Sequence, residues 1–264
     1  MKFKIFPNII LCSLLLLGGT SLDAFGFLGF GDSSSWKEEV QLHDGGKIVV
    51  KRWQSHGGRH ELGQPLPIKD HSVSFSLPGS GNTVTWKDDY SEDVGMANFL
   101  LLALHIRNDT PYLVTSPVGC LGYNKWGRPN PPYVFFKYDG TAWQRISLEE
   151  FPAEFKDINL VIRSYGLEKK LLDQGVVSAE MVKKFNSDLT QPYLKTIIRT
   201  PLEPGSIGVS CKEMISDGKN GWLGLGWFSS APSYSACLKV CEKRGMSAQI
   251  CPCDALLKSN PKWR

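Results

Sequence analysis

Six cysteines carry the clearest chemical signal in this 264-residue chain. An even number of thiols is typical of a protein that forms disulfide bonds in an oxidising compartment. Four of the six lie within the last 30 residues, so the bonds are expected to be concentrated in a C-terminal tail. The predicted disulfide cysteines are Cys120, Cys211, Cys237, Cys241, Cys251 and Cys253.

Two close pairs make up the C-terminal cluster. Cys237 and Cys241 are four residues apart, which places both thiols on one face of a helix. Cys251 and Cys253 are two apart, which places both on one face of a strand. Antiparallel nesting of these segments predicts the pairs Cys241–Cys251 and Cys237–Cys253. The crossed pairing resembles the helix–strand staple of defensins without their extra strand, and spacing alone does not decide between the two.

Metal binding is the alternative chemistry for this cluster. Four thiolates in two close pairs could hold zinc or Cu(I). Neither pair has the two-residue gap usual in zinc sites, and an oxidising compartment favours disulfides. We therefore predict disulfides, with neither a metal nor another cofactor. The remaining pair, Cys120 and Cys211, would join the tail to the rest of the protein.

A second candidate site is the proline-stiffened loop at residues 123–133. It gathers aromatic faces, amide groups and cations, which could stack on a sugar or a peptide and hydrogen-bond its edges. The alternative is a structural cover over a sheet, with Trp126 filling part of the core. The candidate ligand-binding residues are Tyr123, Asn124, Lys125, Trp126, Arg128, Asn130 and Tyr133.

Acid–base groups are scattered, and we predict no catalytic residue. His56 and His60 are four residues apart, but the two glycines between them argue against the helix that would pair them. The acidic residues between positions 88 and 93 match no calcium-loop spacing and predict a solvated turn. His43 and His105 are expected to be structural. Neither a nucleophile elbow nor a phosphate-binding glycine loop is present.

Alternating apolar and polar residues predict about nine short strands between Trp36 and Ile162. The first two are joined by a hairpin turn at Asp44-Gly45, because glycine accepts the positive φ of a tight turn. Residues 78–82 predict a further turn, and Asp139-Gly140 predicts a second hairpin turn. The fold class is therefore mainly β, an antiparallel sandwich or barrel. The expected strands are residues 36–42, 47–53, 73–77, 83–86, 99–106 as a central strand, 112–115, 133–138, 142–146 and 158–162.

Helical spacing follows the strands. Residues 166–173 and 178–189 have a helical pattern, with Ser178 as the N-cap of the second helix. Residues 193–199 are expected to be extended. Residues 234–244 predict a helix that ends at Gly245. A small α-helical, disulfide-rich C-terminal part thus completes the fold. The expected organisation is a signal peptide at 1–26, a flexible lead-in at 27–35, an antiparallel β domain at 36–165, a helical and extended segment at 166–210 and a cysteine-rich helix–strand tail at 211–264.

The N-terminus has the three-part layout of a secretory signal peptide. Lys2 and Lys4 precede an apolar run that ends in small residues, with cleavage expected after Gly26 or, alternatively, after Ala24. The run is too short for a membrane span of about 20 residues, although an uncleaved anchor is the other interpretation. Removing the segment removes Cys12, the seventh cysteine.

These features predict a soluble mature protein in the periplasm or outside the cell. The later apolar runs are too short to cross a membrane. The formal net charge is +4, and positive and negative residues are interspersed, which excludes a nucleic-acid footprint.

Two long motifs carry a family resemblance. One is WKEEV with HDG at positions 36–45, and the other is YNKWGRPNPPYVFFKYDG at 123–140, followed by Trp143 and LEEFP at 148–152. Over residues 36–204 the chain resembles an uncharacterised family of exported proteobacterial proteins. The resemblance implies a bacterial envelope origin and transfers no catalytic residue, and the tail is not associated with it.

Three functions are compatible with the sequence. The first is an exported binding or interaction module that uses residues 123–133 to hold a protein or glycan partner. The second is an envelope hydrolase whose acid and base are His56, His60 or the 88–93 acidic cluster. The third is a structural envelope protein whose apolar segment 221–228 contacts another subunit or the membrane surface. The direction in which Trp126, Arg128 and Tyr133 point discriminates between binding and architecture.

Overall fold

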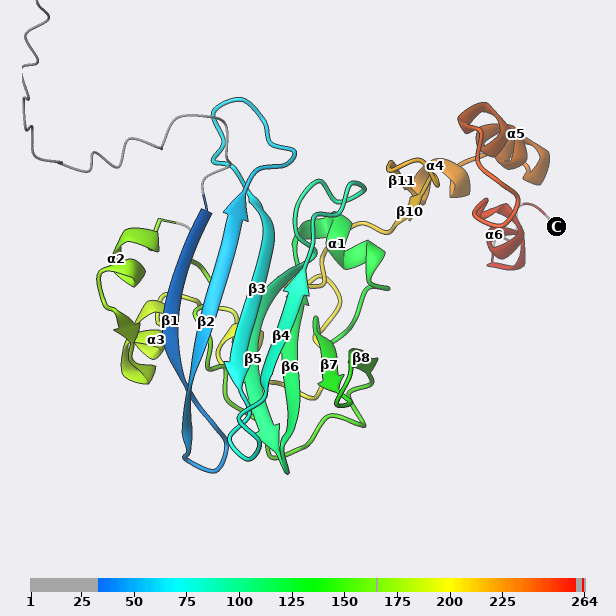
Figure 1. Ribbon diagram of the computed structural model, residues 1–264. Coiled ribbons are helices and arrows are strands. Elements are labelled where there is room, and N and C mark those ends of the chain that lie inside the picture. Colours follow the sequence, from blue (N-terminus) through cyan, green and yellow to red (C-terminus); the bar gives the residue numbers. More distant parts are fainter. Residues whose placement is uncertain (1–32, 165, 260–262, 264) are drawn as a thin grey trace, which may run out of the picture. The chain divides into compact units, whose positions relative to one another are not determined.

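The computed structural model describes residues 33–164, 166–259 and 263 (Figure 1). It is mainly β with antiparallel strand pairs, followed by a small disulfide-bonded part that is helical, so the predicted fold class is confirmed. The signal peptide and residues 27–32 of the lead-in lie outside the described residues. The last three residues of that lead-in, 33–35, already belong to the first strand.

The first sheet contains the hairpins predicted from the glycine-containing turns. Its strand order is β4-β3-β2-β1-β9, with every pair antiparallel except β1 and β9. Along β3 and β4 the side chains alternate between buried and accessible, as expected for strands with one face on a core. The strands are β1 (Ser33–Gln41), β2 (Lys47–His56), β3 (Ile68–Ser76), β4 (Thr83–Asp88) and β9 (Val176–Val177).

The second sheet packs against the first to form a β-sandwich. Its antiparallel strands, in the order β5-β6-β7-β8, are β5 (Phe99–Arg107), β6 (Thr110–Pro117), β7 (Val134–Tyr138) and β8 (Trp143–Ile146). One hydrophobic core combines Val50 and Trp86 of the first sheet with Leu104 and Leu113 of the second. The sandwich, rather than a barrel, therefore encloses this core (Figure 1).

The second sheet is buried on both faces. A second hydrophobic cluster joins Tyr112 and Phe135 of its outer face to Phe151, Phe155 and Ile197 of the segment that follows β8. This explains why β5 and β6 are almost continuously buried and lack the alternation of the first sheet.

Residues 158–162 do not form the strand predicted for them. The Asn159 side chain takes the place of a strand instead: its amide accepts from Leu104 N at 2.9 Å and donates to Leu104 O at 2.8 Å. Leu160 N also donates to Leu102 O. β5 is consequently the end strand of its sheet, not the predicted central strand, and Asn159 covers its open edge.

Short helices occupy the connections. α1 (Gly119–Lys125) lies where a loop was expected, whereas α2 (Glu168–Leu172) and α3 (Ala179–Phe185) fall within the predicted helices. The Ser178 hydroxyl accepts from Met181 N, which confirms the predicted cap. Residues 193–199 were expected to be extended, but their first turn is a 3₁₀ helix, η1 (Pro192–Leu194).

The cysteine-rich tail has its own small core. Phe228 and Met246 pack there with Cys237, Cys241 and Cys253. The predicted helix at 234–244 is confirmed, with Gly245 as its left-handed C-cap. The predicted strand at Cys251 and Cys253 is wrong, because Cys253 begins a helix. The tail elements are β10 (Met214–Ser216), β11 (Trp222–Gly224), α4 (Gly226–Ser229), α5 (Tyr234–Arg244) and α6 (Cys253–Ser259).

Candidate functional site

The polar side chains of the 123–133 segment are turned toward the protein's own backbone. Asn124, on α1, donates to Cys120 O at 2.8 Å and to Lys212 O at 3.0 Å. Its amide oxygen accepts from Met214 N at 2.9 Å and from Arg128 Nη1 at 3.0 Å. Both donors and the acceptor of Asn124 are therefore used within the protein.

Arg128 bonds to the same stretch of backbone as Asn124. Its Nη2 donates to Cys211 O at 2.8 Å, and its guanidinium lies 5.1 Å from the centre of the Tyr123 ring. Cys211 is bonded to Cys120 at the start of α1, with their Cα atoms 5.3 Å apart. Arg128 and this long-range disulfide thus fasten the segment that leads into the tail at the same point.

Trp126 and Lys125 are also engaged. The Trp126 ring packs 4.5 Å from the centre of the Phe99 ring, and its Nε1 donates to Asn98 Oδ1. Lys125 Nζ lies 2.8 Å from Asp93 Oδ1. Burial raises the pKa of Asp93, but the hydrogen bonds from Lys125 and Ser91 outweigh it and hold that pKa below its usual range.

Asn130 and Tyr133 hold the stretch between residues 193 and 202. The Asn130 amide exchanges two hydrogen bonds with the backbone of Leu202. The buried Tyr133 hydroxyl donates to Tyr193 O at 2.8 Å, and burial raises the pKa of that hydroxyl. The predicted ligand residues thus make contacts with three separate stretches of the protein itself, around residues 93–99, 193–202 and 211–214, although Lys125 and Asn130 are exposed.

The acid–base residues considered for a hydrolase have different partners. His60 is exposed, with Nδ1 3.1 Å from Gly58 O. His56 Nε2 lies 3.6 Å from Glu168 Oε1, and both residues line a cavity of about 430 Å³ together with Ser34. Ser34 Oγ has no hydrogen-bond partner among the described residues, so it is not aligned with His56 as a nucleophile.

Asp88 departs from the solvated acidic turn predicted for residues 88–93. It is buried at the end of β4, where its carboxylate accepts from Asn98 Nδ2 and Phe99 N, both at 2.8 Å. His71 Nε2 lies 3.2 Å from the same carboxylate. These bonds join the edge of the first sheet to the beginning of β5, which is a structural role that the acidic run did not reveal.

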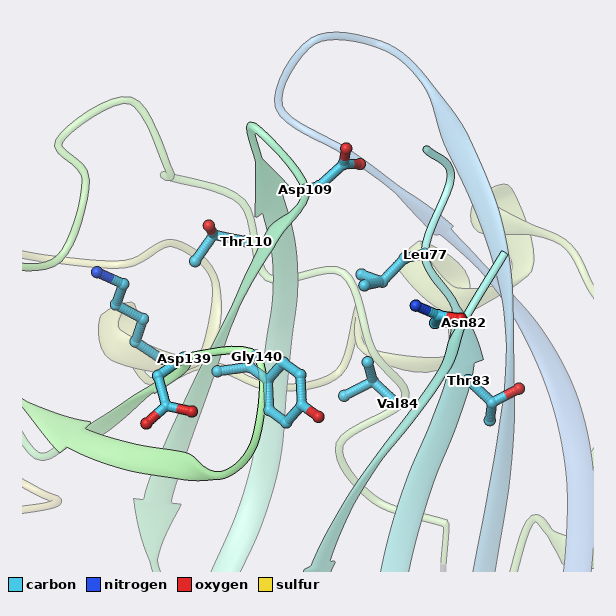
Figure 2. Close-up of a pocket in the computed structure, with 10 residues that line it drawn as sticks. Leu77, Asn82, Thr83, Val84, Asp109, Thr110, Asp139 and Gly140 are labelled. Atoms are coloured by element: carbon cyan, nitrogen blue, oxygen red, sulfur yellow. The ribbon is translucent and has the colours of Figure 1, made fainter. Parts of the chain in front are cut away.

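A cleft of about 660 Å³ opens where three hairpin turns meet (Figure 2). The turns are those between β3 and β4, between β5 and β6, and between β7 and β8. Such a volume lies in the range of small-molecule sites, roughly 300–1,000 Å³. The cleft is lined by Leu77, Asn82, Thr83, Val84, Asp109, Thr110, Lys137, Tyr138, Asp139 and Gly140.

The cleft combines an apolar floor with polar groups that remain available. Leu77 and Val84 supply apolar surface. The side chains of Asn82, Thr83 and Lys137 have no hydrogen-bond or ion-pair partner among the residues that the structure describes. Asn82 and Lys137 therefore bring an amide and a cation to the lining of the cleft that the protein itself does not use, whereas the Thr83 side chain points away from it (Figure 2).

The two carboxylates of the cleft differ in how far the protein uses them. Asp139 Oδ1 accepts from the backbone of Ala142 and Thr141, and these bonds hold the pKa of Asp139 well below its usual range. Asp109 Oδ1 accepts one bond, from Gly79 N at 3.2 Å. Asp139 is thus a fixed anion of the turn, whereas Asp109 keeps acceptor capacity for a ligand.

The sequence predicts two of the three turns of this cleft, but it does not predict that the turns lie next to one another. Asp139-Gly140 and residues 78–82 were each recognised as turns between strands. Asn108 and Asp109 adopt positive φ of 50° and 56° in a tight turn that carries no glycine. Their common site depends on how the two sheets stack, which local patterns do not encode.

No protein-family model, curated protein or solved structure matches the chain. None of the helices in the described part of the chain has the length and apolarity needed to cross a membrane. The site is therefore interpreted from its own geometry.

Proposed function

We propose that the protein is an exported glycan-binding module whose ligand occupies the cleft between the three hairpin turns. The observation that carries the proposal is the contrast between two sets of polar groups. Those of residues 123–133 are consumed by the protein itself, whereas Asn82, Thr83 and Lys137 line a cleft without internal partners. The binding function predicted from the sequence is retained, at a different place.

Export is supported by two independent features. The three disulfides need an oxidising compartment to form and persist. The N-terminal sequence has the layout of a signal peptide. Together they favour the periplasm or the extracellular space, where glycans are the abundant polymers of a bacterial envelope.

The chemistry of the cleft favours a sugar over an apolar ligand. Sugar hydroxyls donate and accept hydrogen bonds, which matches the Asn82 amide, the Lys137 ammonium and the free acceptor capacity of Asp109. The Tyr138 ring, packed 5.5 Å from Trp143, can present an apolar face to sugar C–H groups. The cleft is shallow and polar, which suits an exposed polysaccharide chain.

The test is an NMR titration of the isotope-labelled mature chain with oligomers of β-linked N-acetylglucosamine and, separately, of glucose. We expect amide shifts at Asn82, Thr110 and Gly140. The double variant Asn82→Ala/Lys137→Ala is expected to weaken binding at least about tenfold, which corresponds to roughly 1.4 kcal/mol. Lys51→Ala, an exposed lysine of β2, is the matched control and should bind like the wild type.

Two outcomes would contradict the proposal. Amide shifts that cluster at residues 123–133 would place the ligand on that segment instead of in the cleft. The absence of shifts with both glycans would remove glycan binding, and hydrolysis of the oligomers in the same tube would favour the envelope hydrolase.

A further inference from the structure

Three of the four tail cysteines have their sulfur atoms close together, and the fourth, Cys237, is bonded to one of the three. Cys237 is bonded to Cys253, and Cys241 to Cys251. Between the two bridges, Cys253 Sγ lies 3.8 Å from Cys241 Sγ and 3.5 Å from Cys251 Sγ. The sulfur atoms of Cys241, Cys251 and Cys253 all lie within 4.8 Å of one another.

These separations match those of a tetrahedral thiolate site. Zinc binds four thiolates at about 2.3 Å, which places neighbouring sulfur atoms about 3.8 Å apart. The distances from Cys253 Sγ to Cys241 Sγ and Cys251 Sγ are already close to this value. On reduction, each bonded pair would have to separate by about 2 Å to reach it.

Helices place most of the cluster's cysteines. Cys237 and Cys241 lie one turn apart on α5, which begins at the Ser233 cap and ends at Gly245. Cys253 opens α6. Two adjacent helices thus carry three of the four cysteines, and Cys251 lies just before the second helix.

Access and burial suit a metal site. Cys237, Cys241 and Cys253 are buried against Phe228 and Met246, whereas Cys251 is half-buried. A dry surround strengthens thiolate–metal bonds, and Cys251 offers an entry path. The tail core is too small for stability without a staple or a metal.

We propose that this cluster is a redox-dependent metal site, which binds one Zn²⁺ through four thiolates when both disulfides are reduced. Each disulfide accepts two electrons and two protons from a dithiol, which is itself oxidised to a disulfide. Zn²⁺ then displaces the four thiol protons as the four Zn–S bonds form. Oxidation of the thiolates reverses the sequence, restores the two bridges and releases the metal.

The inference does not depend on glycan binding. The proposal predicts a folded tail in both kinds of compartment, with a bound metal in a reducing one and with two disulfides in an oxidising one. The metal and the disulfides are alternative cross-links of the same two helices, so α5 and α6 are expected to stay packed in both.

Cobalt(II) titration of the full chain tests the site, because tetrahedral Co²⁺–thiolate complexes are coloured. The protein is reduced anaerobically with a phosphine and titrated with Co²⁺, then with Zn²⁺. We expect one Co²⁺ per chain with tetrahedral visible bands, and their loss when Zn²⁺ displaces it. Hydrogen exchange should show protection of α5 in the zinc-loaded form and its loss after chelation.

Three variants locate the ligands. Cys120→Ser/Cys211→Ser should keep the full cobalt spectrum, because this pair lies outside the cluster. Cys253→Ser should lose the tetrahedral bands. Cys241→His should keep a tetrahedral site with a weaker charge-transfer band, which separates ligand loss from misfolding. Absence of stoichiometric tetrahedral cobalt in the reduced wild type, or an unchanged spectrum in Cys253→Ser, would overturn the proposal.

Discussion

Glu38 and Arg52 form an ion pair across strands β1 and β2 that is shielded from solvent. Arg52 Nη1 lies 2.9 Å from Glu38 Oε1, and the two side chains are 5% and 0% exposed. Trp36 Nε1 donates to the other carboxylate oxygen at 2.9 Å, and the guanidinium lies 5.2 Å from the Trp36 ring centre. The WKEEV motif therefore places a buried charge pair on the inward face of the first sheet, which it shares with the core residues Val40 and Val50.

Glu38→Ala is expected to destabilise the protein by about 3–5 kcal/mol, because it leaves the Arg52 cation buried without a partner. Urea unfolding of the wild type and the variant measures the loss. The double variant Glu38→Leu/Arg52→Leu should lose less than the single one, since no unpaired charge remains. The exposed pair Arg107–Glu154 is the control, and Glu154→Ala should have a much smaller effect. A near-neutral Glu38→Ala would refute the prediction.

Arg128→Ala is expected to cost about 2 kcal/mol and to loosen the segment that leads into the tail, because it removes charged hydrogen bonds to Cys211 O and Asn124. Hydrogen exchange of residues 199–214 should increase while glycan binding is retained. Lys137→Ala is the matched control, with unchanged stability and weaker binding. The opposite pattern, lost binding with unchanged exchange, would place the ligand at residues 123–133.

Local patterns predicted most strands because their alternation and turns are local properties. The hairpin at Asp44-Gly45 and the helix that ends at Gly245 are examples, since in each case a glycine supplies the backbone conformation that the turn or cap requires. The strand expected at residues 158–162 failed for the opposite reason. Its residues bond to β5 partly through the Asn159 side chain, whose ladder-like bonding has no sequence signature.

The site was less predictable than the fold. Residues 123–133 were selected by their composition, but whether a polar group is free depends on partners such as Lys212 and Leu202, about 70–90 residues away in sequence. The cleft depends on the stacking of two sheets. The two cysteine pairings that the sequence left open are resolved in favour of the nested one, and the segment with Cys251 and Cys253 leads into a helix rather than a strand.

Removal of the long-range disulfide should affect the sandwich, whereas removal of the tail disulfides should not. Cys120→Ala/Cys211→Ala opens a sequence separation of 91 residues and is expected to cost about 4–5 kcal/mol on the chain-entropy model. Cys237→Ala/Cys253→Ala should unfold the tail core alone. Calorimetry with hydrogen exchange separates the two, and a lowered sandwich transition in the tail variant would contradict the prediction.

The imidazole of His105 should make stability depend on pH. His105 is a buried residue of β5, and its ring stacks on the Phe155 ring with the ring centres 4.6 Å apart. This burial lowers the pKa of His105 from 6.5 to about 4. Its Nδ1 has no partner among the described residues, so protonation gains nothing there. Because the unfolded chain binds the proton more tightly, stability is complete above pH 6.5 and falls as the pH drops toward 4, by about 3 kcal/mol in all.

Urea unfolding at a series of pH values measures this slope. His105→Phe keeps the ring stack on Phe155 and removes the titrating group, so its stability should be nearly constant between pH 6.5 and 4, apart from the contribution of the carboxylates. The exposed His60 provides the control, because His60→Ala should retain the wild-type slope. The hydrogen bond from the imidazole to Asp157 O is lost in His105→Phe, so the variant is expected to be less stable at pH 7.5 while being less sensitive to acid. An identical acid slope in the wild type and His105→Phe would show that His105 does not control the acid sensitivity of the fold.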